Sequence, residues 1–101
     1  MTNLVIRYQT KPEATQPNTE LIQNVFRDLT AAAPKGVGYC VLRTEDGTFF
    51  HIVSYENEEA QGAIPRLPAF AAFQEGGADR RIAPPEFADV TIVGNYQTLP
   101  E

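Results

Sequence analysis

His51 is the only histidine in the chain, and it is the side chain best suited to acid–base chemistry because imidazole has an unperturbed pKa near neutrality. In a pocket, His51 could act as a general base on a phenol or a carbon acid. The alternative is a structural histidine, hydrogen-bonded within a sheet or at an interface, since most buried polar groups only satisfy one another. His51 is therefore the candidate catalytic base, with the structural role left open.

Two arginines, Arg7 and Arg43, fall in runs that are expected to form strands. An arginine side chain on a strand could pair with an anionic substrate or stabilise an enolate. Arg7 is the candidate for this role. Both arginines also fit structural ion pairs, or side chains that reach water along the sheet margin.

Aromatic side chains are candidates to line a cleft for an aromatic ligand. The helical spacing of Phe70 and Phe73, three residues apart, favours a place in the hydrophobic core over a place in the pocket. The aromatic residues considered for ligand binding are Tyr8, Tyr39, Phe70 and Phe73.

Metal and cofactor motifs are missing from the sequence. One histidine and one cysteine, Cys40, supply too few soft ligands for a zinc or iron site. The carboxylates lack the spacing of a calcium loop, and no glycine-rich phosphate loop or nucleophile elbow occurs. We therefore predict no metal and no cofactor, and we interpret Cys40 as a small buried hydrophobe.

A β-hairpin over residues 37–55 positions His51, because an Asp-Gly dipeptide separates two runs of β-branched and aromatic residues. A loop of two or four residues places His51 on one face with Cys40 and Leu42. A loop of three residues places it with Tyr39 instead, because one step of register moves every side chain to the other face. We favour the first arrangement.

The remaining elements surround this hairpin. Residues 4–8 form a β-prone run, and apolar residues recur at helical spacing over 21–29, before Pro34 ends that helix. Pro68 is well placed to begin a second helix, and residues 89–96 read as a closing strand. The order predicts an α+β, ferredoxin-like βαββαβ sandwich, in which two helices cover one face of a four-stranded antiparallel sheet.

Both faces of the expected strands are apolar, although two helices can cover only one of them. Exposing four large apolar side chains would forfeit roughly 1.5–3 kcal/mol for each. We therefore predict a homodimer in which two sheets pack face to face. Depending on register, the dimer face holds either Val5, Phe50, Ile52 and Val93, or Leu4, Ile6, Val53 and Ile92.

Composition restricts the partners. A chain of 101 residues is expected to form one domain over 1–101, and its net charge of −5 argues against nucleic acid. No apolar run approaches the roughly 20 residues of a membrane span, so no membrane partner is expected. A lone cysteine and the lack of an apolar leader predict a cytoplasmic location.

Three segments resemble a known family: residues 46–51 (DGTFFH), residues 67–70 (LPAF) with Phe73 and Gln74, and residues 93–96 (VGNY). With the element order, they make nearly the whole chain similar to the dimeric α+β barrel superfamily, and especially to its antibiotic-biosynthesis-monooxygenase type. That resemblance implies a sheet-to-sheet dimer with a ligand cleft between sheet and helices. Members include cofactor-independent oxygenases of aromatic polyketides, haem-degrading enzymes, isomerases and proteins without assigned activity.

The catalytic residues of those relatives do not transfer directly. The chain has no tryptophan, and its histidine lies on an expected strand rather than on the second helix. The resemblance implies a homodimer that acts on or binds a small aromatic or carbonyl compound, as a monooxygenase-like or isomerase-like protein with His51 as base. The alternative is a non-catalytic metabolite-binding or structural dimer.

Overall fold

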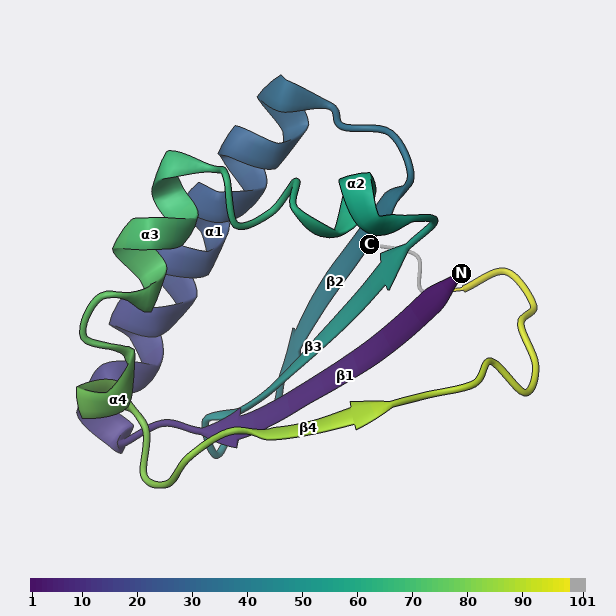
Figure 1. The fold of residues 1–101 in the computed structure, drawn as a ribbon. Coiled ribbons are helices and arrows are strands. Elements are labelled where there is room, and N and C mark those ends of the chain that lie inside the picture. The colour runs from purple at the N-terminus through teal and green to yellow at the C-terminus, as the bar shows by residue number, and fades with distance from the viewer. Residues whose placement is uncertain (99–101) are drawn as a thin grey trace.

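The computed structural model describes residues 1–98 and confirms the predicted α+β architecture. Four strands form one antiparallel sheet in the order β2-β3-β1-β4. Helices α1 and α3 pack along one another on one side of this sheet (Figure 1). The elements are β1 (Thr2–Gln9), the 3-10 helix η1 (Pro12–Ala14), α1 (Thr15–Ala32), β2 (Val37–Arg43), β3 (Thr48–Tyr55), α2 (Glu58–Gln61), α3 (Pro68–Gln74), α4 (Gly77–Arg80) and β4 (Glu86–Asp89).

Helix α1 is longer than its apolar periodicity predicts, because it already begins at Thr15. Its buried residues include Asn18, Ile22 and Val25, which therefore face the sheet. The helix ends where Ala33 takes a left-handed conformation and donates its backbone N–H to the Leu29 carbonyl. Pro34 follows directly and prevents continuation, as expected.

The hairpin register is the alternative that we did not favour. Val41 pairs with His51 and Arg43 with Phe49, while the Thr44 backbone N–H donates to the Thr48 carbonyl at 2.9 Å. This leaves a three-residue loop whose last residue, Gly47, has a φ of +83°, a conformation that glycine adopts without a steric penalty. His51 therefore shares its face with residue 39 rather than with residues 40 and 42.

The predicted closing strand over 89–96 is wrong. Strand β4 starts directly after the Pro84-Pro85 pair and ends at Asp89, which pairs with Leu4 of β1. One further ladder bond joins the Val90 backbone N–H to the Asn3 carbonyl at 3.0 Å. Because β1 begins at Thr2, the chain beyond residue 90 has no strand left to pair with.

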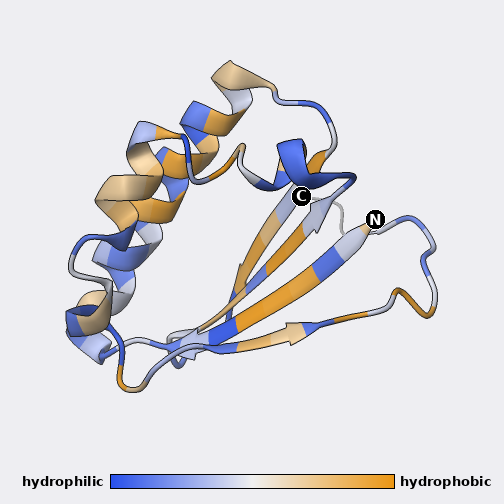
Figure 2. Ribbon diagram, in the orientation of Figure 1, coloured by the Kyte–Doolittle hydropathy of each residue, from blue (hydrophilic) through white to orange (hydrophobic). Residues whose placement is uncertain are grey.

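Apolar side chains face the helices from β1, β2 and β3, and the apolar stretches of these strands stand out in Figure 2. One core cluster holds Val25, Val53, Ile64 and Leu67, and a second holds Tyr8, Ile22 and Phe49. The two clusters join α1 and the residues around α3 to the strands, and the site described below lies between the sheet and α3.

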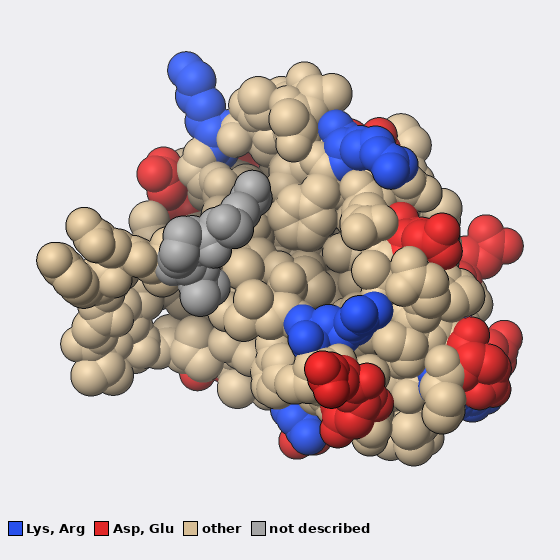
Figure 3. Space-filling view, turned by 180° about the vertical axis from the view of Figure 1, so that it is seen from behind, with Lys and Arg blue, Asp and Glu red and all other residues tan. Residues whose placement is uncertain are grey.

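The opposite sheet face is also apolar and carries no helix. By strand alternation it presents Val5, Cys40, Leu42, Phe50 and Ile52, all of them only partly buried or exposed. Of the two predicted sets, the first is therefore the one whose strand residues, Val5, Phe50 and Ile52, lie on the face without a helix. Val93 is 99% exposed and lies outside the strands. Seen from behind, the molecule shows wide uncharged areas between its Lys, Arg, Asp and Glu side chains (Figure 3).

None of the helices formed by residues 1–98 combines the length and the apolar character that crossing a membrane requires.

Candidate functional site

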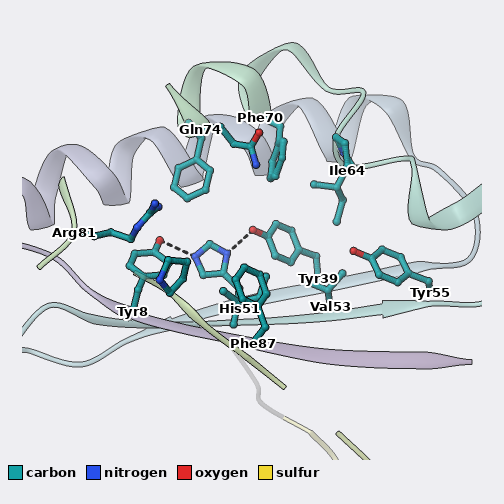
Figure 4. Close-up of a pocket in the computed structure, with 14 residues that line it drawn as sticks. Tyr8, Tyr39, His51, Val53, Tyr55, Ile64, Phe70, Gln74, Arg81 and Phe87 are labelled. Carbon is teal, nitrogen blue, oxygen red and sulfur yellow. Dashed lines mark hydrogen bonds between the residues drawn. The ribbon is translucent and has the colours of Figure 1, made fainter. Parts of the chain in front are cut away.

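A cleft of about 420 Å³ lies between the sheet and α3 (Figure 4). Strands β1, β2, β3 and β4 supply one wall, while α3 and the segment before it supply the other. Its walls are mainly aromatic and aliphatic, which suits a flat apolar ligand. The lining residues are Ile6, Tyr8, Tyr39, His51, Val53, Tyr55, Ile64, Pro65, Phe70, Phe73, Gln74, Arg81, Pro85 and Phe87.

His51 lies on the cleft wall with both ring nitrogens engaged by tyrosine hydroxyls. Nε2 is 2.8 Å from the Tyr8 hydroxyl, and Nδ1 is 2.6 Å from the Tyr39 hydroxyl. The imidazole is 3% exposed and also contacts the Phe73 ring, with centroids 5.8 Å apart. These contacts hold the ring orientation, and Figure 4 shows the three side chains as one continuous hydrogen-bonded row.

Two further residues hold this row from the helix side. The Asn18 side-chain amide donates to the Tyr8 hydroxyl at 3.0 Å, and its carbonyl accepts from Arg80 Nε at 2.8 Å. Arg80 in turn donates to the backbone carbonyls of Phe73 and Glu75. Buried Asn18 therefore has both ends of its amide satisfied, so its orientation is defined.

A count of hydrogens shows what the cluster offers a ligand. Three hydrogen bonds join Asn18, Tyr8, His51 and Tyr39, whereas the one amide hydrogen directed at Tyr8, two hydroxyls and a neutral imidazole supply four hydrogens. If Nδ1 carries the imidazole hydrogen, the Tyr39 hydroxyl hydrogen is left over. If Nε2 carries it, the Tyr8 hydrogen is left over. Both hydroxyls belong to cleft-lining residues, so either tautomer leaves one donor for the ligand.

Burial sets the ionisation of this cluster. It lowers the pKa of His51 to about 4, because a desolvated imidazolium is unfavourable. Burial also raises the pKa of Tyr39 and of Tyr8, although the Asn18 hydrogen bond and the charges of Arg80 and Arg81 oppose the rise at Tyr8. At neutral pH all three groups are therefore uncharged.

The lowered pKa of His51 predicts a loss of stability in acid. Below pH 6.5 the unfolded chain binds a proton on His51 that the folded chain does not take up until about pH 4. The free energy of unfolding is thus fully maintained above pH 6.5 and falls as the pH drops towards 4, by about 3 kcal/mol from this group alone. Urea unfolding at pH 7.0 and pH 4.5 measures the loss.

The control for this pH experiment is His51→Phe, which retains every carboxylate but lacks the imidazole. Its loss of stability between the two pH values should be smaller than that of the unsubstituted protein. Equal losses in the two proteins would contradict the lowered pKa.

The structure brings together most of the predicted site residues. Tyr8, Tyr39, Phe70 and Phe73 line the same cleft as His51. Two of them also have core contacts, since Tyr8 stacks on Phe49 and Tyr39 stacks on Phe26.

Arg7 is not brought to this cleft. It alternates with Tyr8 along β1 and therefore points to the opposite sheet face. There it forms an ion pair with Glu86 at 3.0 Å, with half of its side chain exposed.

Cys40 also lies on the face opposite to the imidazole, so the diagonal neighbourhood expected from the favoured register is wrong. Its register partner across the hairpin is Ile52. The thiol is partly buried on the sheet face that carries no helix.

Several residues of the site were not among the sequence candidates. Asn18 supports the cluster through the Tyr8 hydroxyl without lining the cleft, whereas Arg81 lines it. Both come from segments outside the hairpin, and only long-range packing brings them to the His51 cluster. The further lining residues are Ile6, Val53, Tyr55, Ile64, Pro65, Gln74, Pro85 and Phe87.

Within residues 1–98, no group of three or more His, Cys, Asp or Glu side chains is arranged to hold a metal ion. The polar groups that line the cleft are instead phenol, imidazole, amide and guanidinium groups.

The fold is that of antibiotic-biosynthesis-monooxygenase-like proteins, as the resemblance predicted. A candidate antibiotic biosynthesis monooxygenase from Bacteriodes thetaiotaomicron superposes with a TM-score of 0.79 at 17% identity, covering 98% of this chain and 95% of that one. A second candidate, from Nitrosomonas europaea, gives 0.74 at 14% identity over 93% and 100% of the chains. A protein of unknown function from the same organism gives 0.71 at 20% identity over 99% and 94%.

No protein-family model matches the sequence, and a search of curated proteins found no match. At these sequence identities the structural likeness describes the fold, and the chemistry has to be argued from the cleft.

Proposed function

We propose that the cleft binds a small aromatic or carbonyl compound and that the Tyr8–His51–Tyr39 cluster removes a proton from its hydroxyl group. The resulting anion then reacts with dioxygen, as in a cofactor-independent monooxygenase, or is reprotonated elsewhere, as in an isomerase. The observation that carries the proposal is an imidazole held between two tyrosine hydroxyls on the wall of an aromatic cleft. The names of several structural neighbours as antibiotic biosynthesis monooxygenases support the oxygenase form.

Proton removal passes through Tyr39 in this mechanism. In the tautomer with hydrogen on Nε2, the Tyr39 hydroxyl donates to Nδ1 of His51. A substrate hydroxyl donates to the Tyr39 oxygen, and a coupled shift of both hydrogens leaves an imidazolium and a substrate anion. The anion then accepts a hydrogen bond from Tyr39, and the imidazolium keeps its other N–H bond to Tyr8.

The low pKa of His51 is compatible with this role. Without an anion beside it an imidazolium at position 51 has no counter-charge, and burial disfavours it. A substrate anion beside the cluster supplies that charge and raises the pKa of His51 while it is present. The imidazole is therefore a transient base that returns its proton once the anion is consumed.

Non-catalytic binding is the alternative function, and one observation favours it. Both nitrogens of His51 are already satisfied by Tyr8 and Tyr39, so the cluster is stable without a substrate. In that case the cleft would bind the same class of compound, but it would not accelerate its oxidation or isomerisation.

Exposure to 1-naphthol under air tests the proposal. Oxidation consumes one dioxygen for each 1,4-naphthoquinone formed, and the second oxygen atom leaves as water. We expect fluorescence-detected binding of 1-naphthol and dioxygen uptake above the uncatalysed rate. Binding without uptake would support the non-catalytic alternative, and no binding at millimolar concentration would contradict both functions.

A matched pair of variants locates the binding. Gln74→Trp places an indole at the cleft and should weaken binding, because Gln74 is exposed but lines the cavity. Gln23→Trp adds the same group to an exposed position of α1 away from the cleft and should leave binding unchanged. Equal effects of the two substitutions would place the naphthol elsewhere.

We also propose that two copies of the chain pack through the sheet face that carries no helix. Ile52 and Phe50 lie there, only partly buried in the isolated chain.

Ile52→Glu should therefore convert a dimer into a monomer, because two carboxylates would be buried in the symmetric contact. Sedimentation equilibrium at micromolar concentration measures the change, with exposed Gln23→Glu as the control. An unsubstituted protein that sediments as an 11.2 kDa particle would contradict the dimer.

A further inference from the structure

We propose that the natural ligand of the cleft is an acid, whose carboxylate binds Arg81 while its reacting hydroxyl lies at the Tyr39–His51 pair. This inference rests on the proposed function and adds the charge of the ligand to it. The feature behind it is a cleft-lining guanidinium that has no counter-charge within the described part of the chain.

Arg81 differs from Arg80 beside it, and from Arg7 on the opposite sheet face, in that its side chain has no hydrogen-bond or ion-pair partner among residues 1–98. Arg80 is hydrogen-bonded to Asn18 and to backbone carbonyls, and Arg7 is paired with Glu86. Within residues 1–98 the Arg81 side chain makes no hydrogen bond or ion pair, and its Nε is buried without an acceptor. Partly buried guanidinium groups normally have partners, so the lack of one at a cleft-lining arginine indicates a place where a ligand supplies it.

The backbone of Arg81 is fixed although its side chain is unpaired. Residue 81 forms an antiparallel bridge with Thr10, and the Ile82 backbone N–H donates to the Gln9 carbonyl at 2.9 Å. These hydrogen bonds hold the segment after α4 against the C-terminal end of β1. The guanidinium is thus presented to the cleft from a rigid position.

The side chain is also directed by its packing. The Arg81 guanidinium carbon lies 5.9 Å from the centroid of the Tyr8 ring, and Figure 4 shows it entering at the end of the cleft where Tyr8 lies. On its other side it rests against Gly77, where an added Cβ would come within 2.9 Å of Nη1. Glycine at position 77 therefore leaves the space that the guanidinium occupies.

Charge complementarity then selects the ligand. The chain carries a net charge of −5, so a non-specific attraction for anions is not expected from the protein as a whole. A carboxylate in the cleft would supply the counter-charge that the Arg81 guanidinium lacks and form charge-assisted bonds with it, which are the strong ones in a poorly hydrated cleft. A neutral ligand would leave the guanidinium without a counter-charge. The cleft should therefore prefer an acid over the matching neutral phenol.

Two probes test the preference: 1-naphthol, and 5-hydroxy-1-naphthoate, which is the same phenol with a carboxylate on its second ring. We expect the unsubstituted protein to bind the acid at least about tenfold more tightly, measured by fluorescence titration. Arg81→Gln should remove this preference, so that the dissociation constants of the two probes differ by less than about twofold. Gly77→Ala should reduce the preference without removing a charge, because it displaces the guanidinium. Arg27→Gln, at an exposed position of α1, is the matched charge control and should keep the full preference.

The outcomes separate this inference from the proposed function. Binding of 1-naphthol without any preference for the acid would overturn the role of Arg81 and leave the proposed function standing. A preference that survives in Arg81→Gln but is lost in Arg7→Gln would assign the anion to Arg7 and overturn the inference as well. If neither probe binds, the proposed function fails and this inference fails with it.

Discussion

His51→Phe is expected to slow the oxidation of a cleft-bound phenol by about 100- to 10,000-fold, the usual contribution of a positioned general base. Phenylalanine keeps the aromatic contact with Phe73 but removes both ring nitrogens. The Tyr39 hydroxyl then has no acceptor for its hydrogen, so the relay described above cannot move a proton. Initial rates of dioxygen uptake at saturating 1-naphthol measure the effect.

Two measurements keep this result interpretable. Loss of the imidazole leaves the Tyr39 hydroxyl unpaired at a cost of about 1–3 kcal/mol, so folding is checked first by circular dichroism and urea unfolding. Tyr39→Phe should reduce turnover while retaining His51, because the intermediary hydroxyl is missing. If folded His51→Phe protein keeps full turnover, His51 has no part in the reaction.

Phe49→Ala should lower the free energy of unfolding by about 3–5 kcal/mol, a large share of the 5–15 kcal/mol that is typical of a small folded chain. Phe49 is 1% exposed and stacks on Tyr8 with ring centroids 5.4 Å apart. It packs in the cluster that also holds Ile22 of α1. Its removal opens a cavity beside the Tyr8 ring. Urea unfolding at a fixed protein concentration measures the loss.

The adjacent residue is the matched control. Phe50 is the same residue type on the same strand, but it points to the sheet face that carries no helix and is only partly buried. Under conditions where the protein is monomeric, Phe50→Ala should cost clearly less than Phe49→Ala. Equal losses would mean that the two sheet faces are equally buried in solution, which contradicts the described packing.

Much of the fold could be predicted from the sequence because hydrophobic period and turn residues are local properties. The apolar spacing over 21–29 identified α1, and Pro68 marked the start of α3. The closing strand was placed too late, because apolar content at 90–93 is a local pattern whereas a strand needs a partner. Its partner β1 begins only at Thr2, and the sequence around residue 90 does not reveal where that strand begins.

The candidate site could be predicted only in part. His51 and four aromatic residues were identified by type, and they do line one cleft. The contribution of Asn18 and Arg81 depends on where α1 and the segment after α4 come to lie, which no local pattern reveals. The sheet-to-sheet dimer and the cytoplasmic location stay predictions.

The length of the turn between β2 and β3 determines which functional group adjoins the imidazole. With three residues in the loop, Tyr39 lies opposite Val53, and its hydroxyl is hydrogen-bonded to Nδ1 of His51. A slip of the pairing by one residue, with Thr44 opposite Phe49, would bring the Cys40 thiol opposite Val53 and turn the phenol to the outer surface. The register set at this turn therefore separates a phenol–imidazole pair from a thiol–imidazole pair, and divergence of activity in such chains can begin at a turn.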